Sequence, residues 1–232
     1  MNIILYKLKN YKNLESIICN LTHLYYDYKF NDKVDNIPEG ITDIKFEYHF
    51  NQQVNNLPQS LQNLTFFGCF DQPIDNLPNG LLNLFFHCYF NYPINNLPYS
   101  LQNLVLDNKF NCTVDNLPLN IQNLTFGWDF NCTVDNLPST LLNLTFGHKF
   151  NQTVDNLPHN LQNLTFGYQF NQTVDNLPHN LQNLTFGDKF NQTVNNLPST
   201  LLNLTFGYEL NQSVDNLPNS LIIMNLVFLI KN

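Results

Sequence analysis

Apolar residues recur along this chain with a fixed spacing of twenty. The clearest unit, residues 157–176, reads LPHNLQNLTFGYQFNQTVDN, and its apolar positions are Leu157, Leu161, Leu164, Phe166, Phe170 and Val174. No insertion or deletion interrupts this spacing between residues 17 and 216. So strict a period predicts a solenoid in which each repeat forms one coil.

The L-x-x-L-x-F segment of each unit ends in the alternation typical of a short strand with one buried face. Leu164 and Phe166 are expected to point into the core, and Thr165 to point to solvent. Stacked coils then place these strands side by side in a parallel sheet, with about 4.8 Å between neighbours. Strands are expected to begin near Asn63 and at every twentieth residue after it.

The rest of each unit favours turns. Its Leu-Pro pair removes one backbone donor and disfavours a helix before it. Asn163, Asn171 and Asn176 have counterparts in almost every unit, and asparagine can satisfy the unpaired backbone groups of a corner. We therefore predict a mainly β solenoid of 20-residue coils with a parallel sheet on one face, little helix, and asparagine ladders between coils.

Composition supports this fold and excludes several functions. The 232 residues include 42 Asn but no Ala and no Arg, so the best helix formers are missing. A net charge of −8 without any Arg argues against binding nucleic acid or anionic membranes. The N-terminus has no apolar stretch long enough for a signal peptide, and residues 221–230 are too few to span a bilayer. Five Cys then predict free thiols in a reducing, cytoplasmic compartment.

The repeat register divides the chain into three parts. Residues 1–16 are expected to form an N-terminal cap, in which Ile4 and Tyr6 face the strands, and residues 17–216 to form ten repeats. Residues 217–232 are a partial last repeat and a C-terminal cap, with Val227 to Ile230 lying over the end of the core. If that apolar end stayed exposed, it could pair with another copy, so we expect a monomer or a weak end-to-end dimer.

The sequence shows no catalytic motif, no cofactor site and no metal site. His159 and His179 occupy equivalent places in adjacent units and could together hold a transition metal. No carboxylate or Cys repeats beside them, which favours a solvated ladder. Cys112 and Cys132 are related in the same way and are expected to remain neighbouring thiols. The chain is therefore predicted not to be an enzyme.

The two residues before each repeated Phe vary most between units. They are expected to form one stripe along the rim that follows the strands, and the alternative is that they are unconstrained loop tips. Because Tyr and Trp are enriched at binding hot spots, this stripe is the predicted protein-binding surface. Its candidate residues are Tyr48, His49, Tyr89, Lys109, Trp128, Asp129, His148, Lys149, Tyr168, Gln169, Tyr208 and Glu209.

Threonine recurs in two further rows. One row is Thr125, Thr145, Thr165, Thr185 and Thr205, and the other is Thr113, Thr133, Thr153, Thr173 and Thr193. Regular Thr rows are similar to ice-binding surfaces, which is a remote alternative function. The simpler explanation is the strand propensity of Thr.

The pattern L-P-x-x-L-x-x-L-x-F-G-x-x-F-N-x-x-V resembles the FNIP repeat, a short relative of leucine-rich repeats. It is clearest at residues 70–74 and 90–94, which read FDQPI and FNYPI, and the resemblance covers residues 17–226. It implies a leucine-rich-repeat-like fold and a non-enzymatic role in protein–protein interaction. Such repeats are known from amoebae and giant DNA viruses, so the resemblance implies the cytoplasm, or the host cytoplasm for a viral protein.

Some FNIP proteins resemble ubiquitin-ligase adaptors that carry an F-box before the repeats. In this chain the repeat register already begins at Ile17, which leaves too few residues for an F-box. The alternative function is therefore a substrate-recognition component of a ubiquitin-ligase complex that lacks its own F-box.

Overall fold

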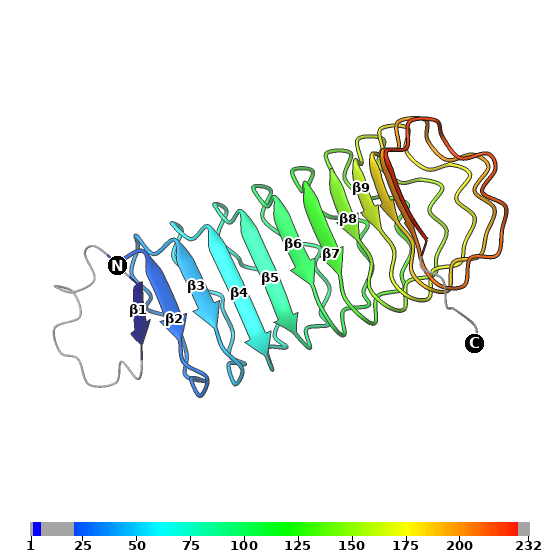
Figure 1. The fold of residues 1–232 in the computed structure, drawn as a ribbon. Coiled ribbons are helices and arrows are strands. Elements are labelled where there is room, and N and C mark those ends of the chain that lie inside the picture. Colours follow the sequence, from blue (N-terminus) through cyan, green and yellow to red (C-terminus); the bar gives the residue numbers. More distant parts are fainter. Residues whose placement is uncertain (1, 6–20, 227–232) are drawn as a thin grey trace.

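The computed structural model describes residues 2–5 and 21–226, which form one twelve-stranded parallel sheet. The strands follow one another in chain order, as Figure 1 shows, and none of the described residues is helical. Their bounds are β1 (Asn2–Leu5), β2 (His23–Tyr26), β3 (Asp43–Phe46), β4 (Asn63–Gly68), β5 (Asn83–Cys88), β6 (Asn103–Leu106), β7 (Asn123–Phe126), β8 (Asn143–Thr145), β9 (Asn163–Thr165), β10 (Asn183–Thr185), β11 (Asn203–Phe206) and β12 (Ile223–Leu226).

The register confirms the twenty-residue coil. Leu164 pairs with Leu184, and Leu184 pairs with Leu204. Leu164 and Phe166 are 1% and 2% exposed, whereas Thr165 between them is half-buried. The alternation of inward and outward residues is therefore the one that the sequence predicts, and strands begin at Asn63 and at every twentieth residue as far as Asn203.

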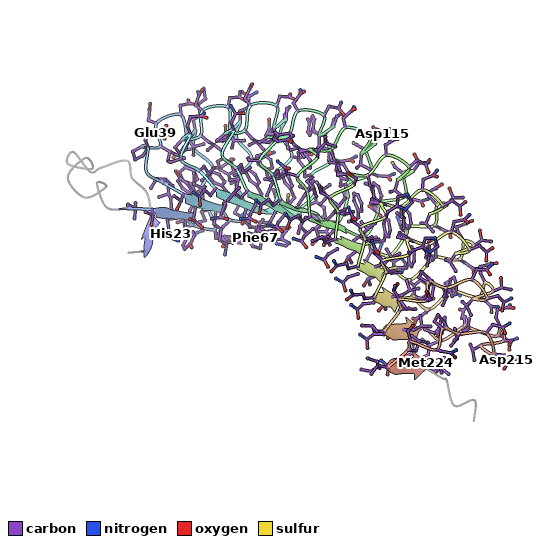
Figure 2. All side chains as sticks on the ribbon, turned by 90° about the horizontal axis from the view of Figure 1, so that it is seen from above. His23, Glu39, Phe67, Asp115, Asp215 and Met224 are labelled. Atoms are coloured by element: carbon purple, nitrogen blue, oxygen red, sulfur yellow. The ribbon has the colours of Figure 1, made fainter. Side chains whose placement is uncertain are left out.

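The solenoid is curved, with the sheet on its concave face and the return segments on its convex face (Figure 2). Two ladders of stacked phenylalanine rings run through the core between these faces. Phe146, Phe166 and Phe186 lie on the sheet side, with 5.7 Å between successive ring centroids. Phe170, beyond the corner, lies 6.1 Å from both Phe150 and Phe190. The wider spacing away from the sheet fits a stack that fans outward.

Asparagine ladders join the coils in three ways. At the start of the strands, each side-chain amide donates to the equivalent one in the preceding coil, as Asn183 does to Asn163. After the corner, the Asn151 side-chain oxygen accepts the backbone N–H of Asn171 at 2.8 Å. On the return, Asn176 donates to the Asp155 carboxylate at 3.1 Å. The prediction that these asparagines bond neighbouring coils is confirmed.

The corner after the strand differs between the two halves of the solenoid. From Gly127 onward it carries Gly, and a Cβ added at Gly147 would lie 1.9 Å from the carbonyl oxygen of Gly127. Earlier coils carry Phe67 and His87 at this position, and there β4 and β5 extend to six residues. The coils of the second half therefore approach too closely at this corner for any residue with a Cβ.

The first coil departs from the twenty-residue spacing. Ile3 pairs with Leu24 and Ile4 pairs with Tyr25, which is a spacing of 21 residues. Ile3 is therefore in register with Leu24, and the N-terminal cap with its placement of Ile4 stays a prediction. Tyr6 lies outside the described residues.

The last described coil leaves apolar side chains accessible. Met224 pairs with Leu204 in the inward register but is 43% exposed. Ile222 and Ile223 are 75% and 50% exposed. The predicted cover, residues 227–230, falls outside the described residues, so the extents of the two caps stay predictions.

In residues 2–5 and 21–226, no helix is long and apolar enough to cross a membrane.

Candidate functional site

The predicted rim stripe lies at the corner after the strands, where backbone hydrogen bonds hold it in register. The N–H of Lys149 donates to the carbonyl of Trp128, and the N–H of Gln169 donates to that of His148. Trp128 is 55% exposed, and Tyr168 and Tyr208 are also exposed. The rim residues of the second half are thus held in register, with their aromatic side chains exposed.

Stacked rings and ion pairs connect the rim residues of the second half. His148 lies between Trp128 and Tyr168, with centroid distances of 4.0 and 4.8 Å. Lys189 lies over the Tyr168 ring and pairs with Glu209, whose hydrogen bond raises the pKa of this lysine. One rim ion pair joins Lys149 to Asp129 at 2.6 Å, and Gln169 is exposed beside this stack.

The rim residues of the first half form separate clusters. Tyr28 stacks on Tyr48 at 5.4 Å, and His49 meets the Tyr28 ring edge-on at 4.8 Å. The neighbouring Cys69 thiol and Tyr89 phenol raise the pKa of Tyr48.

The extended strand β5 interrupts the stripe. It turns Cys88 into the core, where burial raises the pKa of this thiol to about 12. Its neighbour Tyr89 remains exposed, with the Lys109 amine 5.0 Å from its ring centroid. In this coil only Tyr89 of the two varied residues therefore remains on the rim, and the stripe stays a predicted binding surface.

A second surface, on the concave face, was missed by the sequence analysis. At the central outward position of the strands, the first half carries five different residues, and the second half carries Thr in every coil. Two positions later, the first half again varies and the second half carries only Gly. The varied residues are Tyr25, Lys45, Thr65, Phe85 and Val105 at the first position, and Asp27, Glu47, Phe67, His87 and Asp107 at the second.

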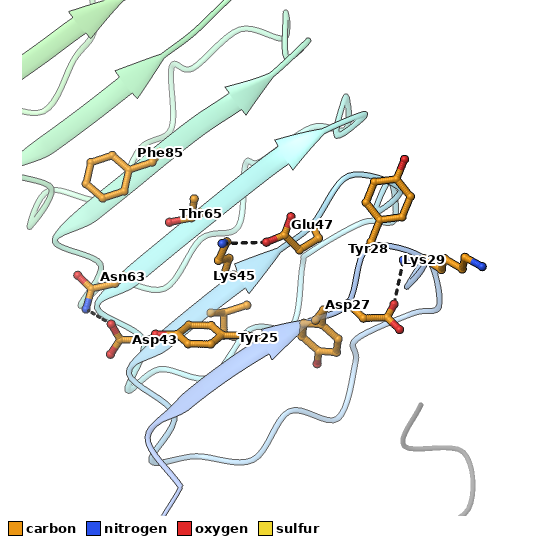
Figure 3. Close-up of a pocket in the computed structure, with 12 residues that line it drawn as sticks. Tyr25, Asp27, Tyr28, Lys29, Asp43, Lys45, Glu47, Asn63, Thr65 and Phe85 are labelled. Atoms are coloured by element: carbon orange, nitrogen blue, oxygen red, sulfur yellow. Dashed lines mark hydrogen bonds and ion pairs between the residues drawn. The ribbon is translucent and has the colours of Figure 1, made fainter. Parts of the chain in front are cut away.

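A hollow of about 1030 Å³ over β2–β5 (Figure 3) is lined in part by six of them, Tyr25, Asp27, Lys45, Glu47, Thr65 and Phe85. Lys45 lies at its centre, 2.8 Å from the Glu47 carboxylate and 4.6 Å from the centroid of the Phe67 ring. Asp43 accepts hydrogen bonds from Asn63 at 2.8 Å and Thr42 at 2.6 Å. The hollow therefore combines aromatic rings with fixed charges.

The varied surface continues beyond the hollow. The His87 ring lies 5.1 Å from the Phe67 ring, and its Nδ1 lies 3.7 Å from the Asp107 carboxylate. A smaller hollow of about 300 Å³, lined in part by His87, Tyr48 and Tyr89, leads from here to the rim. We call the set Tyr25, Lys45, Glu47, Phe67, Phe85 and His87 the N-terminal concave surface.

A signal for this surface exists in the sequence. The candidate residues were chosen as those that vary between coils, and the outward strand positions of the first half vary in the same way. That variation is easy to overlook because the second half repeats Thr at one position and Gly at the other. Comparing the two halves separately would have identified both positions.

The other candidate residues do not form a site in the described part of the chain. His159 and His179 are exposed, and no group of three His, Cys, Asp or Glu side chains there could hold a metal ion. Cys112 and Cys132 are free thiols that donate to Asn91 and Asn111. The Thr165 row lies on the concave sheet and the Thr153 row on the return segments, so they do not form one surface.

Comparison with known proteins places these coils in a family. The sequence profile of the FNIP repeat matches residues 30–69, 112–149, 150–189 and 173–209. No curated protein matches the chain.

Five chains of solved structures match this one, and two of them are compared with it. The first is CroV588 from the giant virus CroV, described as a novel circular LRR protein, with a TM-score of 0.81 and 40% identity over 88% of this chain. This chain spans only 36% of that protein. The second is YopM from Yersinia enterocolitica WA-314, with a TM-score of 0.46 and 18% identity over 90% of this chain and 60% of YopM.

Proposed function

Because this chain belongs to the FNIP-repeat family and has the open, leucine-rich-repeat-like scaffold fold typical of protein-interaction modules, we propose that it is a non-enzymatic scaffold that binds a protein partner through its N-terminal concave surface.

The observation that supports this proposal is where the coils differ. Core positions and asparagine ladders are nearly the same in both halves, while the outward strand positions vary only in the first. Phe67 and Phe85 are half-buried at the centre of the varied area, with Glu47 and Asp107 toward its edges. Aromatic side chains surrounded by polar groups are typical of binding hot spots.

The rim residues extend this proposed surface. Tyr48 and Tyr89 line the smaller hollow that adjoins His87, so the rim of the first half continues the concave surface. The stack of Trp128, His148 and Tyr168 lies along the rim of the second half and stays a predicted second contact.

A photo-crosslinking experiment tests the proposed function. A photoreactive phenylalanine analogue is placed at Phe85 and, in a matched variant, at Thr165 on the same face of the second half. The protein that crosslinks through position 85 is identified and purified, and its binding to the unlabelled chain is measured.

We expect crosslinking at position 85 but not at position 165. Binding of the purified partner should then fall at least about tenfold in Phe85→Ala, as expected for an aromatic hot spot, and stay unchanged in Thr165→Ala. Equal crosslinking at both positions, or a Phe85→Ala variant that binds normally, would refute the assignment to this surface.

The two alternative functions, a ubiquitin-ligase component and an ice-binding surface, remain predictions. The ubiquitin-ligase role came from the family resemblance, and copurification with ligase components would test it. Ice binding requires an extended Thr surface, but the Thr165 row lies on a concave sheet (Figure 2). A cytoplasmic location and a monomer or weak end-to-end dimer also remain proposals. Ile222, Ile223 and Met224 are exposed apolar residues of the last described coil.

A further inference from the structure

We propose that the N-terminal concave surface recognises a partner segment in which an apolar anchor is flanked by arginine or lysine side chains. This inference rests on the proposed function and specifies the chemistry of the partner. It follows from the balance of charges around the hollow, from the state of its lysines and from its aromatic rings.

Carboxylates dominate the hollow and its border. Asp27, Asp43 and Glu47 line the hollow, and Asp107 lies on the same face beyond His87. Lys29 and Lys45 are the lysines in the lining. The surface is therefore complementary to a positively charged partner, and the chain as a whole carries a net charge of −8.

Neither lysine neutralises the interior of the hollow. Lys45 is already paired with Glu47 and packed on the Phe67 ring. The Lys29 side chain points away from the other lining residues, as Figure 3 shows. Asp43 accepts hydrogen bonds from two neutral donors, Asn63 and Thr42, and the His23 Nε2 lies 3.6 Å from its carboxylate. No lysine in the described part of the chain pairs with Asp43, so its carboxylate can still meet a basic side chain of a partner.

The Lys45 amine already makes the two contacts that we infer for a basic side chain of the partner. Its amine lies over an aromatic ring and beside a carboxylate at the same time, 4.6 Å from the Phe67 centroid and 2.8 Å from Glu47. Tyr25 and Phe85 are half-buried rings of the same hollow. An arginine placed near them could stack on a ring while pairing with Asp43, since its planar guanidinium suits both contacts.

The dimensions of the surface suit a short extended segment. Four neighbouring strands, β2 to β5, carry the outward residues of the hollow. With about 4.8 Å between neighbouring strands, the distance from the first to the fourth is about 14 Å, which an extended chain covers in about four or five residues. An apolar side chain in the middle of such a segment would meet Phe67 or Phe85, with basic side chains on either side.

Three matched peptides test the inference. Each is a fluorescently labelled octapeptide with a central Leu-Phe pair, flanked on both sides by three arginines, three glutamines or three glutamates. Binding to the full chain is measured by fluorescence anisotropy at low and at high salt. We expect the arginine peptide to bind most tightly and the glutamate peptide not to bind.

Matched variants separate recognition by this surface from general attraction to an acidic protein. Asp43→Asn and Asp155→Asn remove the same charge, one from the hollow and one from the convex face. We expect the first to weaken arginine-peptide binding about fivefold, as expected for an ion pair that is partly shielded from water, and the second to have no effect. Phe85→Ala should weaken binding of the arginine and glutamine peptides alike, at least about tenfold.

Other outcomes would overturn the inference. Equal losses in Asp43→Asn and Asp155→Asn would mean that only net charge attracts the peptide. Equal binding of the arginine and glutamine peptides, both lost in Phe85→Ala, would leave the proposed binding surface intact but refute its preference for basic partners. If no peptide bound, the basic-segment inference would fail, and the crosslinking experiment would decide the proposed function separately.

Discussion

The two halves of the solenoid share one core but present different surfaces. Residues 21–110 and residues 121–210 both stack buried Leu and Phe in register, and from Asn63 onward they share the asparagine ladder at the start of the strands. On the concave face, the first half shows aromatic and charged side chains, whereas the second shows a Thr row and a Gly corner. The residues that the two halves share are those that each coil needs in order to fold. The residues that differ are not required for folding and are free to change.

The reason for this separation is the geometry of stacking. An inward residue contacts its own equivalents in the coils before and after it, as Phe170 does with Phe150 and Phe190. A change in one core residue must therefore suit two neighbours at once. An outward residue is open to solvent on one side and is less constrained by its neighbours, so partner recognition can develop there at a lower cost in stability.

The largest effect is expected from the shared core. Phe70 and Phe170 are both fully buried, so Phe70→Ala and Phe170→Ala should each lower the free energy of unfolding by about 3–5 kcal/mol. Urea unfolding followed by circular dichroism would measure both. Because coil and interface energies are nearly additive in a solenoid, a central change could also separate unfolding into two transitions. If only one of these two variants lost stability, the cores of the two halves would not be equivalent.

Substitutions at the corner after the strand should affect the stability of the two halves most differently. Gly147→Ala would place a Cβ against the Gly127 carbonyl and should cost at least about 2 kcal/mol through overpacking. Glu47→Ala, at the same position of the repeat, removes a partly exposed ion pair and should cost less than about 1 kcal/mol. Thermal unfolding of the two variants provides the measurement. Similar costs would contradict the close approach of coils in the second half.

The buried thiol of the first half should make stability pH-dependent. In the folded chain the pKa of Cys88 is about 12, raised from 9.0 by burial. Above pH 9 the unfolded thiol ionises and the folded one does not, so stability is lost as the pH rises from 9 toward 12. Between pH 8 and pH 10 this thiol should lower the free energy of unfolding by about 1 kcal/mol.

Cys88→Val removes that alkaline loss. Urea unfolding of the wild type and the variant at both pH values would show whether the difference between them grows with pH. The equivalent residue of a later coil, His148, lies on the rim. A pH-dependent difference between wild type and Cys88→Val would therefore also show that β5 turns this position inward. A constant difference between wild type and variant would contradict the burial of Cys88.

The smallest effect on stability is expected at the outward strand positions. Phe85→Thr gives the first half the residue of the second, and Thr165→Val makes a similar exchange in the second half. Each should change the free energy of unfolding by less than about 1 kcal/mol, because surface substitutions seldom exceed this. Only Phe85→Thr should reduce partner binding. A large loss of stability in that variant would indicate that Phe85 serves the fold instead of recognition.

The sequence alone determined the coil and its core. The twenty-residue period fixes which residues stack, and the alternation in L-x-x-L-x-F fixes which of them point inward. Both inferences hold because neighbouring coils repeat the same local conformation, so one unit describes the rest. The asparagine ladders follow from the same argument, since equivalent asparagines must lie beside one another.

The tertiary structure decided what the period cannot express. Ile4 pairs with Tyr25, at a spacing of 21 residues instead of 20. Cys88 turns inward because β5 continues through the corner. Both features depart from the common pattern of the repeat. The concave surface also depends on stacking, because Lys45, Phe67 and Phe85 come from three different coils. Residues about twenty apart in the chain become neighbours only when the coils stack. The chemistry of this surface therefore arises between repeats, whereas the fold is already specified within each one.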